Sequence, residues 1–260
     1  MWVVTWEGPA DQADWLLCED GLAGAEEIEL DGGHRRLRLF FSDAVRAREV
    51  ARHAAGTIAW ESDEPPLAYQ QQWAPIPVGR RFFLRPPWLI DQPPPGRIEL
   101  IMQPGAIFGS GDHATTQLCL ILLGETVTPG DIVIDAGTGT GILGIAAGLL
   151  GAERVYAFDL DPAAVTMSRR SVEEAGTTVH LWAGSWDSCR GGVATGLVAN
   201  LPGGLLLDAV SDLLPLVRPG GWMILSGILP EHRPPLEQKL GARPLRWREQ
   251  DGWLGLVAQL

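Results

Sequence analysis

The stretch Val133-Ile134-Asp135-Ala136-Gly137-Thr138-Gly139-Thr140-Gly141-Ile142-Leu143 decides the fold of this 260-residue chain. An apolar strand ends there in an acidic residue, three glycines follow at alternate positions, and an apolar helix begins. Alternate glycines let the backbone turn sharply and lie close to a ligand, because no Cβ stands in the way. The next apolar run, 154–158, ends in Asp159, whose carboxylate can accept both hydroxyls of a ribose. This order predicts a nucleoside-binding α/β sheet, with the ligand across the carboxyl ends of the strands.

Two classes of nucleoside cofactor fit this glycine loop. Gly139, Gly141 and Gly144 have the spacing of the dinucleotide fingerprint, and Asp159 follows at the distance that this fingerprint expects. In a dinucleotide fold, however, the helix N-terminus faces a pyrophosphate, and Asp135 would lie beside that anion and repel it. A cationic amino acid moiety would instead be attracted. The residues therefore favour the glycine loop of class I methyltransferases, which bind S-adenosylmethionine, over one that binds NAD.

Composition and charge are those of a globular enzyme, with 46% hydrophobic and 20% charged residues. The net charge of −12 argues against general nucleic-acid binding, which needs a basic face, so we expect no direct contact with DNA. No apolar run approaches the ~18 residues of a membrane span, and the start of the chain does not resemble a signal peptide. The three cysteines are far apart and form no metal or disulfide pattern. We expect a cytoplasmic protein, a monomer, without a metal site or a membrane contact.

The chain divides by pattern into three regions. Residues 1–62 alternate as βαββαβ, the order of a small ferredoxin-like domain, which we expect to recognise the substrate. Residues 63–98 hold nine of the twenty prolines, which predicts a semi-rigid linker. Residues 99–260 repeat a βα unit, which predicts a catalytic domain built on a parallel sheet with right-handed crossovers.

The third region predicts seven strands, over 131–135, 154–158, 178–182, 194–199, 221–227, 243–249 and 253–259. Asp251-Gly252 between the last two is a tight hairpin turn, so one of these strands runs antiparallel. Seven strands ending in such a hairpin are typical of class I methyltransferases, whereas the dinucleotide sheet has six strands. The expected fold class is therefore α/β, a seven-stranded Rossmann-like methyltransferase sheet with a small N-terminal ferredoxin-like α+β domain.

A second glycine-rich loop precedes the first of these strands. It reads Phe108-Gly109-Ser110-Gly111-Asp112-His113-Ala114-Thr115-Thr116 and leads into a helix expected from residue 117 to 124. Hydroxyls and free amides at a helix start suit a carboxylate, such as that of a methionine moiety. The same residues could form only a tight loop with an N-cap. The loop enters the same sheet edge as the first glycine loop, which favours a ligand-binding role.

With these motifs the chain resembles the PrmA family, the methyltransferases of large-subunit ribosomal protein eleven. Residues 108–116 match the family's Phe-Gly-Thr/Ser-Gly-x-His-x-Thr-Thr position for position, and Gly-Ile-Leu recurs at 141–143. Further matches are Asp159-Leu160-Asp161-Pro162, Val198-Ala199-Asn200-Leu201 and Ser226-Gly227-Ile228-Leu229. The resemblance covers the whole chain, strongly from about residue 100 to 230 and weakly in residues 1–62.

The resemblance implies an enzyme that transfers methyl groups from S-adenosylmethionine to lysine side chains of ribosomal protein eleven, with the N-terminal amine as a further acceptor and S-adenosylhomocysteine as product. In this reading Thr116 bonds the methionine end, Asp159 takes the ribose hydroxyls, and Asn200 is the catalytic candidate where the methyl meets its acceptor. His113 is either a second catalytic candidate, as a general base, or an organiser of its loop. The cofactor contacts implied are Phe108, Gly109, Thr116, Asp135, Gly137, Gly139, Asp159 and Asn200.

Two alternatives to this function stay open at this stage. One is a methyltransferase-fold protein that acts on another protein or on a small-molecule amine, and the other is a non-catalytic assembly factor. Pro202-Gly203-Gly204 departs from the less rigid stretch that family members carry after the fourth strand, which bears on the acceptor side. Asp112 and Asp187 could each hold the proton of the acceptor amine, and spacing does not choose between them.

Overall fold

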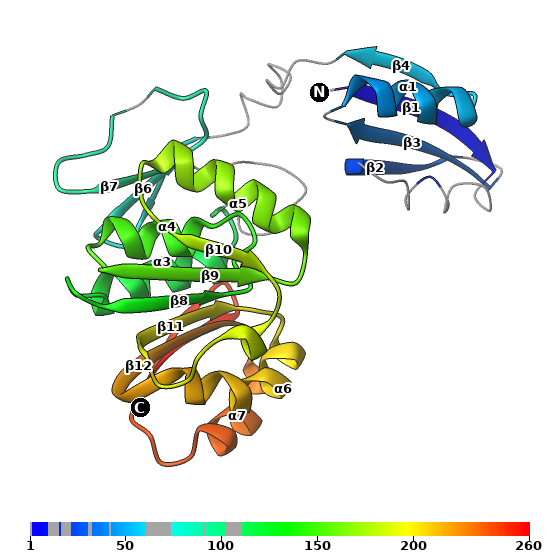
Figure 1. Ribbon diagram of the computed structural model, residues 1–260. Coiled ribbons are helices and arrows are strands. Elements are labelled where there is room, and N and C mark those ends of the chain that lie inside the picture. Colours follow the sequence, from blue (N-terminus) through cyan, green and yellow to red (C-terminus); the bar gives the residue numbers. More distant parts are fainter. Residues whose placement is uncertain are drawn as a thin grey trace. The chain divides into compact units, whose positions relative to one another are not determined.

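The computed structural model describes residues 2–9, 16, 22–30, 33–41, 43–60, 74–90, 92–101 and 111–260 (Figure 1). The chain divides into two compact units, Met1–Gln72 and Trp73–Leu260. Every helix in the described part of the chain is too short or too polar to cross a membrane.

The first unit is a four-stranded antiparallel sheet that carries a helix on one face. Its strands follow the order β2-β3-β1-β4, which is the order of a ferredoxin-like fold. Val4 of β1 and Leu39 of β3 lie opposite each other and are fully buried in the core shared with α1. The first helix of the expected βαββαβ order falls near residues 11–18, and most of these residues lie outside the described part of the chain. The elements are β1 (Trp2–Pro9), β2 (Leu22–Leu30), β3 (His34–Phe41), α1 (Ala44–His53) and β4 (Thr57–Trp60).

The second unit is built on a seven-stranded sheet with the order β10-β9-β8-β11-β12-β14-β13. Strand β14 runs antiparallel to both of its neighbours, and the other contacts in the sheet are parallel. Asp251 and Gly252 both have positive φ, at 51° and 78°, as a tight hairpin turn requires. The predicted methyltransferase sheet is confirmed. Its strands are β8 (Ile132–Ala136), β9 (Arg154–Asp159), β10 (His180–Ala183), β11 (Ala194–Asn200), β12 (Val217–Ile228), β13 (Leu245–Gln250) and β14 (Trp253–Gln259).

Helices cover both faces of this sheet (Figure 1). Successive strand residues point to opposite faces, so Val133 packs into the core under α3 and α4, whereas Ile134 packs into the core under α6 and α7. Each central strand therefore carries apolar residues on both faces, as expected for a parallel sheet buried on both sides. The helices are α3 (Ala114–Thr126), α4 (Ile142–Leu149) and α5 (Pro162–Ala175) on one face, and α6 (Gly203–Leu213) and α7 (Arg233–Leu240) on the other.

The structure differs from the predicted linker over 63–98. Residues 74–101 hold a three-stranded sheet, β5 (Ile76–Val78), β6 (Phe82–Arg85) and β7 (Ile98–Ile101), which belongs to the second unit. Its side chains, Phe82, Leu84 and Leu100 among them, join the core with α3 and α4. The described prolines of this region are compatible with the sheet. Pro77 lies on the edge strand β5, Pro75 precedes that strand, and five prolines lie in the loop after β6, where a missing N–H is tolerated.

Candidate functional site

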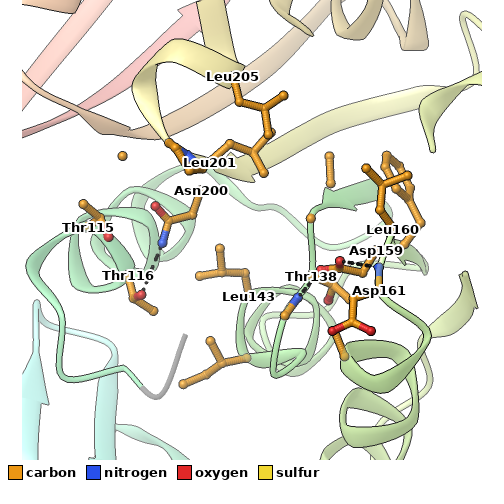
Figure 2. Close-up of a pocket in the computed structure, with 18 of the residues that line it drawn as sticks. Thr115, Thr116, Thr138, Leu143, Asp159, Leu160, Asp161, Asn200, Leu201 and Leu205 are labelled. Atoms are coloured by element: carbon orange, nitrogen blue, oxygen red, sulfur yellow. Dashed lines mark hydrogen bonds between the residues drawn. The ribbon is translucent and has the colours of Figure 1, made fainter. Parts of the chain in front are cut away.

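A cavity of about 580 Å³ opens at the carboxyl ends of the central strands of the second unit (Figure 2). Its wall comes from the start of α3, the glycine loop after β8 and the loops after β9, β10 and β11. The end of β12 and the start of β14 complete it. Ligands of open α/β sheets bind in this place. Six of the predicted site residues line it together: His113, Thr116, Gly137, Gly139, Asp159 and Asn200.

The glycine loop takes a conformation that its glycines permit. Gly137, Gly139 and Gly141 have φ of 74°, 54° and 87°, in the left-handed region that other residues rarely adopt. The backbone N–H groups of Gly137 and Thr138 both donate to the carbonyl oxygen of Phe158 at 2.9 Å, which ties the loop to β9. The loop is therefore shaped before any ligand arrives.

Asp159 lies at the end of β9 and holds this loop from the cavity side. Its Oδ2 accepts a hydrogen bond from the Gly139 N–H at 2.9 Å, and its Oδ1 accepts one from the Asp161 N–H at 3.0 Å (Figure 2). A carboxylate oxygen has more than one lone-pair site. Both oxygens can therefore still accept hydroxyl donors from the cavity.

Asp135 does not reach the cavity, contrary to the prediction that it contacts the cofactor. It is fully buried beneath the glycine loop, where its Oδ2 accepts from the Thr138 hydroxyl at 2.7 Å and the Gly144 N–H at 2.9 Å. Burial raises the pKa of Asp135 to about 6, the two hydrogen bonds oppose this shift, and the nearby charge of Asp159 adds a smaller increase. The carboxyl group thus braces the loop from inside.

Asn200 ends β11 on the opposite wall of the cavity. Its Nδ2 donates to the hydroxyl oxygen of Thr116, in the first turn of α3, at 3.2 Å (Figure 2). Its Oδ1 is buried and has no hydrogen-bond partner among the residues that the structure describes. A buried carbonyl oxygen without a partner is uncommon in folded proteins. Asn200 therefore offers an acceptor to a ligand in this cavity.

His113 is the N-cap of α3, since its Nδ1 accepts from the backbone N–H of Thr115 at 3.3 Å and lies 2.8 Å from that residue's hydroxyl oxygen. The ring also meets Trp253 edge-on, with centroids 5.2 Å apart. These contacts favour the loop-organising alternative. The two remaining predicted contacts, Phe108 and Gly109, lie outside the described residues.

The segment after Asn200 begins a helix, although it departs from the family pattern. Pro202 is the N-cap of α6, and a Cβ on Gly203 would lie 2.2 Å from His232 Nδ1, so a larger residue there would have to displace the His232 ring. Gly227 has φ of 85°, and a Cβ on it would lie 2.0 Å from the carbonyl oxygen of Leu201. The backbone after Asn200 therefore rests directly on β12.

Several wall residues were not predicted from the sequence. Leu160 and Leu205 are apolar yet 68% and 43% exposed, and both face the cavity with Trp186. Leu160 follows Asp159 directly, which is the one signal that could have identified it. Large apolar side chains left open on a cavity wall suit a flat apolar ligand group. In the described ranges, no group of three His, Cys, Asp or Glu side chains could hold a metal ion.

Comparisons with known proteins identify the family. The family model described as "Ribosomal protein L11 methyltransferase (PrmA)" matches residues 49–260. Proteins named ribosomal protein L11 methyltransferase from Symbiobacterium thermophilum and Gloeobacter violaceus are each 33% identical, over 96% and 100% of this chain and 83% and 89% of their own. The crystal structure of a ribosomal protein L11 methylase from Lactobacillus delbrueckii subsp. bulgaricus superposes with a TM-score of 0.67 at 29% identity, over 72% of this chain and 98% of that one. This chain belongs to the PrmA family of ribosomal protein L11 methyltransferases.

Proposed function

We propose that this protein transfers methyl groups from S-adenosylmethionine to amines of ribosomal protein L11, chiefly lysine side chains, with the N-terminal amine as a further acceptor. The observation that carries the proposal is one cavity with two different walls. On one wall Asp159 and the glycine loop suit a nucleoside. On the other wall Asn200 presents a buried acceptor oxygen that has no partner among the described residues. Family membership supplies the reaction class.

The cavity fits S-adenosylmethionine better than it fits a dinucleotide. Apart from His113, the charged residues described on its wall are Asp159 and Asp161, both acidic. A pyrophosphate would be repelled there, whereas the sulfonium and amino groups of S-adenosylmethionine are cations. Asp159 then takes the ribose hydroxyls, and Leu160 and Trp186 cover the adenine. When bound, S-adenosylmethionine supplies the electrophilic methyl group.

On the opposite wall, Asn200 orients the acceptor. A neutral amine attacks the methyl carbon with its lone pair, so its N–H groups must point away from that carbon. Asn200 Oδ1 is placed to accept one of these N–H groups, which aligns the lone pair. Most of the acceleration then comes from positioning and from exclusion of water, because the reaction needs little acid–base help.

Substrate recognition belongs to residues 1–62 in this proposal. That region holds twelve Asp and Glu against six Arg, so its docking onto a basic surface of ribosomal protein L11 should weaken with salt. A chain that starts at residue 73 keeps β5–β7 and every proposed cofactor contact. It should bind S-adenosylmethionine and lose methyl transfer to intact ribosomal protein L11. If the full-length chain and the chain that starts at residue 73 are equally active, the first unit does not recognise the substrate and serves stability or assembly instead.

The proposal is tested by mass spectrometry of ribosomal protein L11 incubated with the enzyme and S-adenosylmethionine. Mass increments of whole methyl groups on lysine residues are expected, and omission of either component should abolish them. If calorimetry detects cofactor binding while ribosomal protein L11 stays unmodified, another amine is the substrate. If calorimetry detects no cofactor binding, the non-catalytic alternative holds.

A further inference from the structure

One hydrogen bond joins two segments that are 84 residues apart at the acceptor side of the cavity. It runs from Asn200 Nδ2, at the end of β11, to the Thr116 hydroxyl oxygen, in the first turn of α3. We propose that Thr116 is a positioning residue for methyl transfer, because it holds the Asn200 amide with Oδ1 turned to the acceptor amine. This inference rests on the proposed function and adds to the cofactor contact expected of Thr116.

The two ends of a primary amide are nearly equal in shape and opposite in chemistry. The oxygen accepts hydrogen bonds, whereas the NH2 group donates two. If the NH2 group of Asn200 faced the acceptor amine, it would compete for the lone pair that must attack the methyl carbon. The oxygen accepts an N–H of that amine and leaves the lone pair free. A fixed amide orientation therefore matters for turnover.

Thr116 selects the productive orientation by accepting from Nδ2. A hydroxyl oxygen has two lone pairs, so it can accept a hydrogen bond from an N–H group. The reversed amide would need the hydroxyl proton for Asn200 Oδ1, so the hydroxyl could then no longer donate to the carboxylate of a bound methionine moiety. The observed orientation leaves Oδ1 buried without a partner in the described part of the chain.

Both ends of this hydrogen bond are anchored by rigid contacts. Thr116 is fully buried, and the His113 cap fixes the turn from which it projects. Asn200 is followed by Leu201, whose backbone N–H donates to Ser226 of β12 at 3.2 Å and whose carbonyl oxygen rests against Gly227. Neither side chain can follow a displaced partner easily, so loss of the hydrogen bond should free the amide to turn.

The hydroxyl proton of Thr116 has a separate use. Within the described residues no acceptor takes it. The same hydroxyl can accept from Asn200 while it donates to the carboxylate of the methionine moiety. Cofactor affinity and acceptor alignment would then share one oxygen atom, and an experiment has to separate the two effects.

Threonine-to-valine substitution tests the role because it removes the hydroxyl and keeps the shape. At saturating S-adenosylmethionine, Thr116→Val should lower kcat on ribosomal protein L11 about ten-fold or more, since a freed amide misplaces the amine. Thr116→Ser restores the hydroxyl and should recover most of the rate. Thr126→Val is the matched control, because Thr126 ends the same helix and its buried hydroxyl has no partner in the described residues. Equal kcat for the Thr116→Val and Thr126→Val variants would overturn the inference.

A double-mutant cycle separates positioning from cofactor contact. In an Asn200→Ala background the amide is gone, so Thr116→Val should lower kcat no further, although any effect on cofactor affinity should persist. An equal loss of kcat in both backgrounds would show that Thr116 acts without Asn200 and would reject the proposal.

The side-chain amide signal of Asn200 in an NMR spectrum gives a readout without activity. It should shift in the Thr116→Val variant and stay in place in the Thr126→Val variant, and an unmoved signal in both would reject the hydrogen bond. If the wild type leaves ribosomal protein L11 unmethylated, the proposed function fails. The Asn200 amide signal then still shows whether the hydrogen bond to Thr116 exists. If the wild type is active and Thr116→Val turns over normally, only the positioning role fails.

Discussion

The two walls of the cavity differ in how complete they are before a ligand binds. On the first wall both oxygens of Asp159 already accept backbone N–H groups, and the glycine loop is tied to Phe158. On the second wall Asn200 Oδ1 is buried and lacks a partner in the described residues. In the proposed function, the wall that takes the nucleoside is thus preorganised by folding, whereas the wall that takes the methyl acceptor would be completed by the substrate.

This difference assigns different energetic roles to the two walls. A preorganised wall costs no rearrangement when the ligand arrives. An unsatisfied buried acceptor carries a penalty of about 1–3 kcal/mol, which a correctly placed N–H donor recovers. A methyl-accepting molecule without an N–H group at this place would leave the penalty on Asn200 Oδ1. In the proposed function, the incomplete wall would therefore contribute to selection of the amine as well as to its orientation.

The largest expected effect concerns the buried brace of the preorganised wall. The pKa of Asp135 is raised from 3.8 to about 6, so the folded protein binds a proton more readily than the unfolded chain between these values. The free energy of unfolding should therefore fall as pH rises from about 3 to about 7, by about 3 kcal/mol through this group alone. Asp135→Asn should remove that part of the slope in denaturant titrations at both pH values. Identical slopes for wild type and variant would show that the carboxyl titrates normally.

The next effect should appear in turnover and leave cofactor affinity nearly unchanged. Asn200→Ala removes the acceptor oxygen of the incomplete wall, and misplacement of the amine by about 1 Å can cost ~10²-fold in rate. Steady-state kinetics on ribosomal protein L11 and calorimetry with S-adenosylmethionine measure the two quantities. Near-normal turnover would mean that Asn200 only ends its strand and that another group positions the amine.

Substitution on the preorganised wall should act on cofactor affinity. Asp159→Ala removes the proposed acceptor of the ribose hydroxyls and the two hydrogen bonds from the backbone N–H groups of Gly139 and Asp161. Each charge-assisted hydrogen bond contributes about 1.5–3 kcal/mol. S-adenosylmethionine should therefore bind ten-fold or more weakly. Asp131→Ala is the control, since Asp131 accepts from Thr128 ahead of β8, away from the cavity. Unchanged affinity in calorimetry, or tight binding of NAD by the wild type, would contradict the assignment.

The smallest effect is expected at His113. Asparagine is also a good N-cap, so His113→Asn keeps the start of α3 and removes the imidazole. The pH profile of kcat should keep its shape, and kcat should change only a few-fold. A general base contributes about 10²–10⁴-fold, so a loss of that size, with an altered profile, would restore His113 as a catalytic residue.

Pattern and spacing predicted the sheet, because each strand of a parallel sheet is a short apolar run that ends at a turn signal. They also predicted the convergence of Asp159 and Asn200, since both residues follow strands whose carboxyl ends share one edge. The predicted linker was wrong over residues 74–98, because the apolar run Phe82-Phe83-Leu84 forms a buried strand despite the many prolines around it. The hydrogen bond from Asn200 to Thr116 joins segments that are distant in the sequence, so no local sequence pattern could predict it.

The buried position of Asp135 follows from the alternation of side chains along β8. Side chains alternate along a strand, so Asp135 shares a face with Val133, two residues earlier, and Val133 lies in the core under α3 and α4. Its carboxyl group must therefore point under α4 and not out over the strand end. The charge of Asp135 therefore does not distinguish the two classes of cofactor, and Asp159 and Asp161 are the acidic residues described on the cavity wall.

The contact between Gly227 and Leu201 limits how this acceptor site can diverge. A saturation library at position 227 should return glycine alone, because any side chain would collide with the backbone that carries Asn200. Gly204 has open space around a Cβ and should accept many residues. New acceptor preferences can therefore evolve along the start of α6, while the position of the amide at the strand end stays constant.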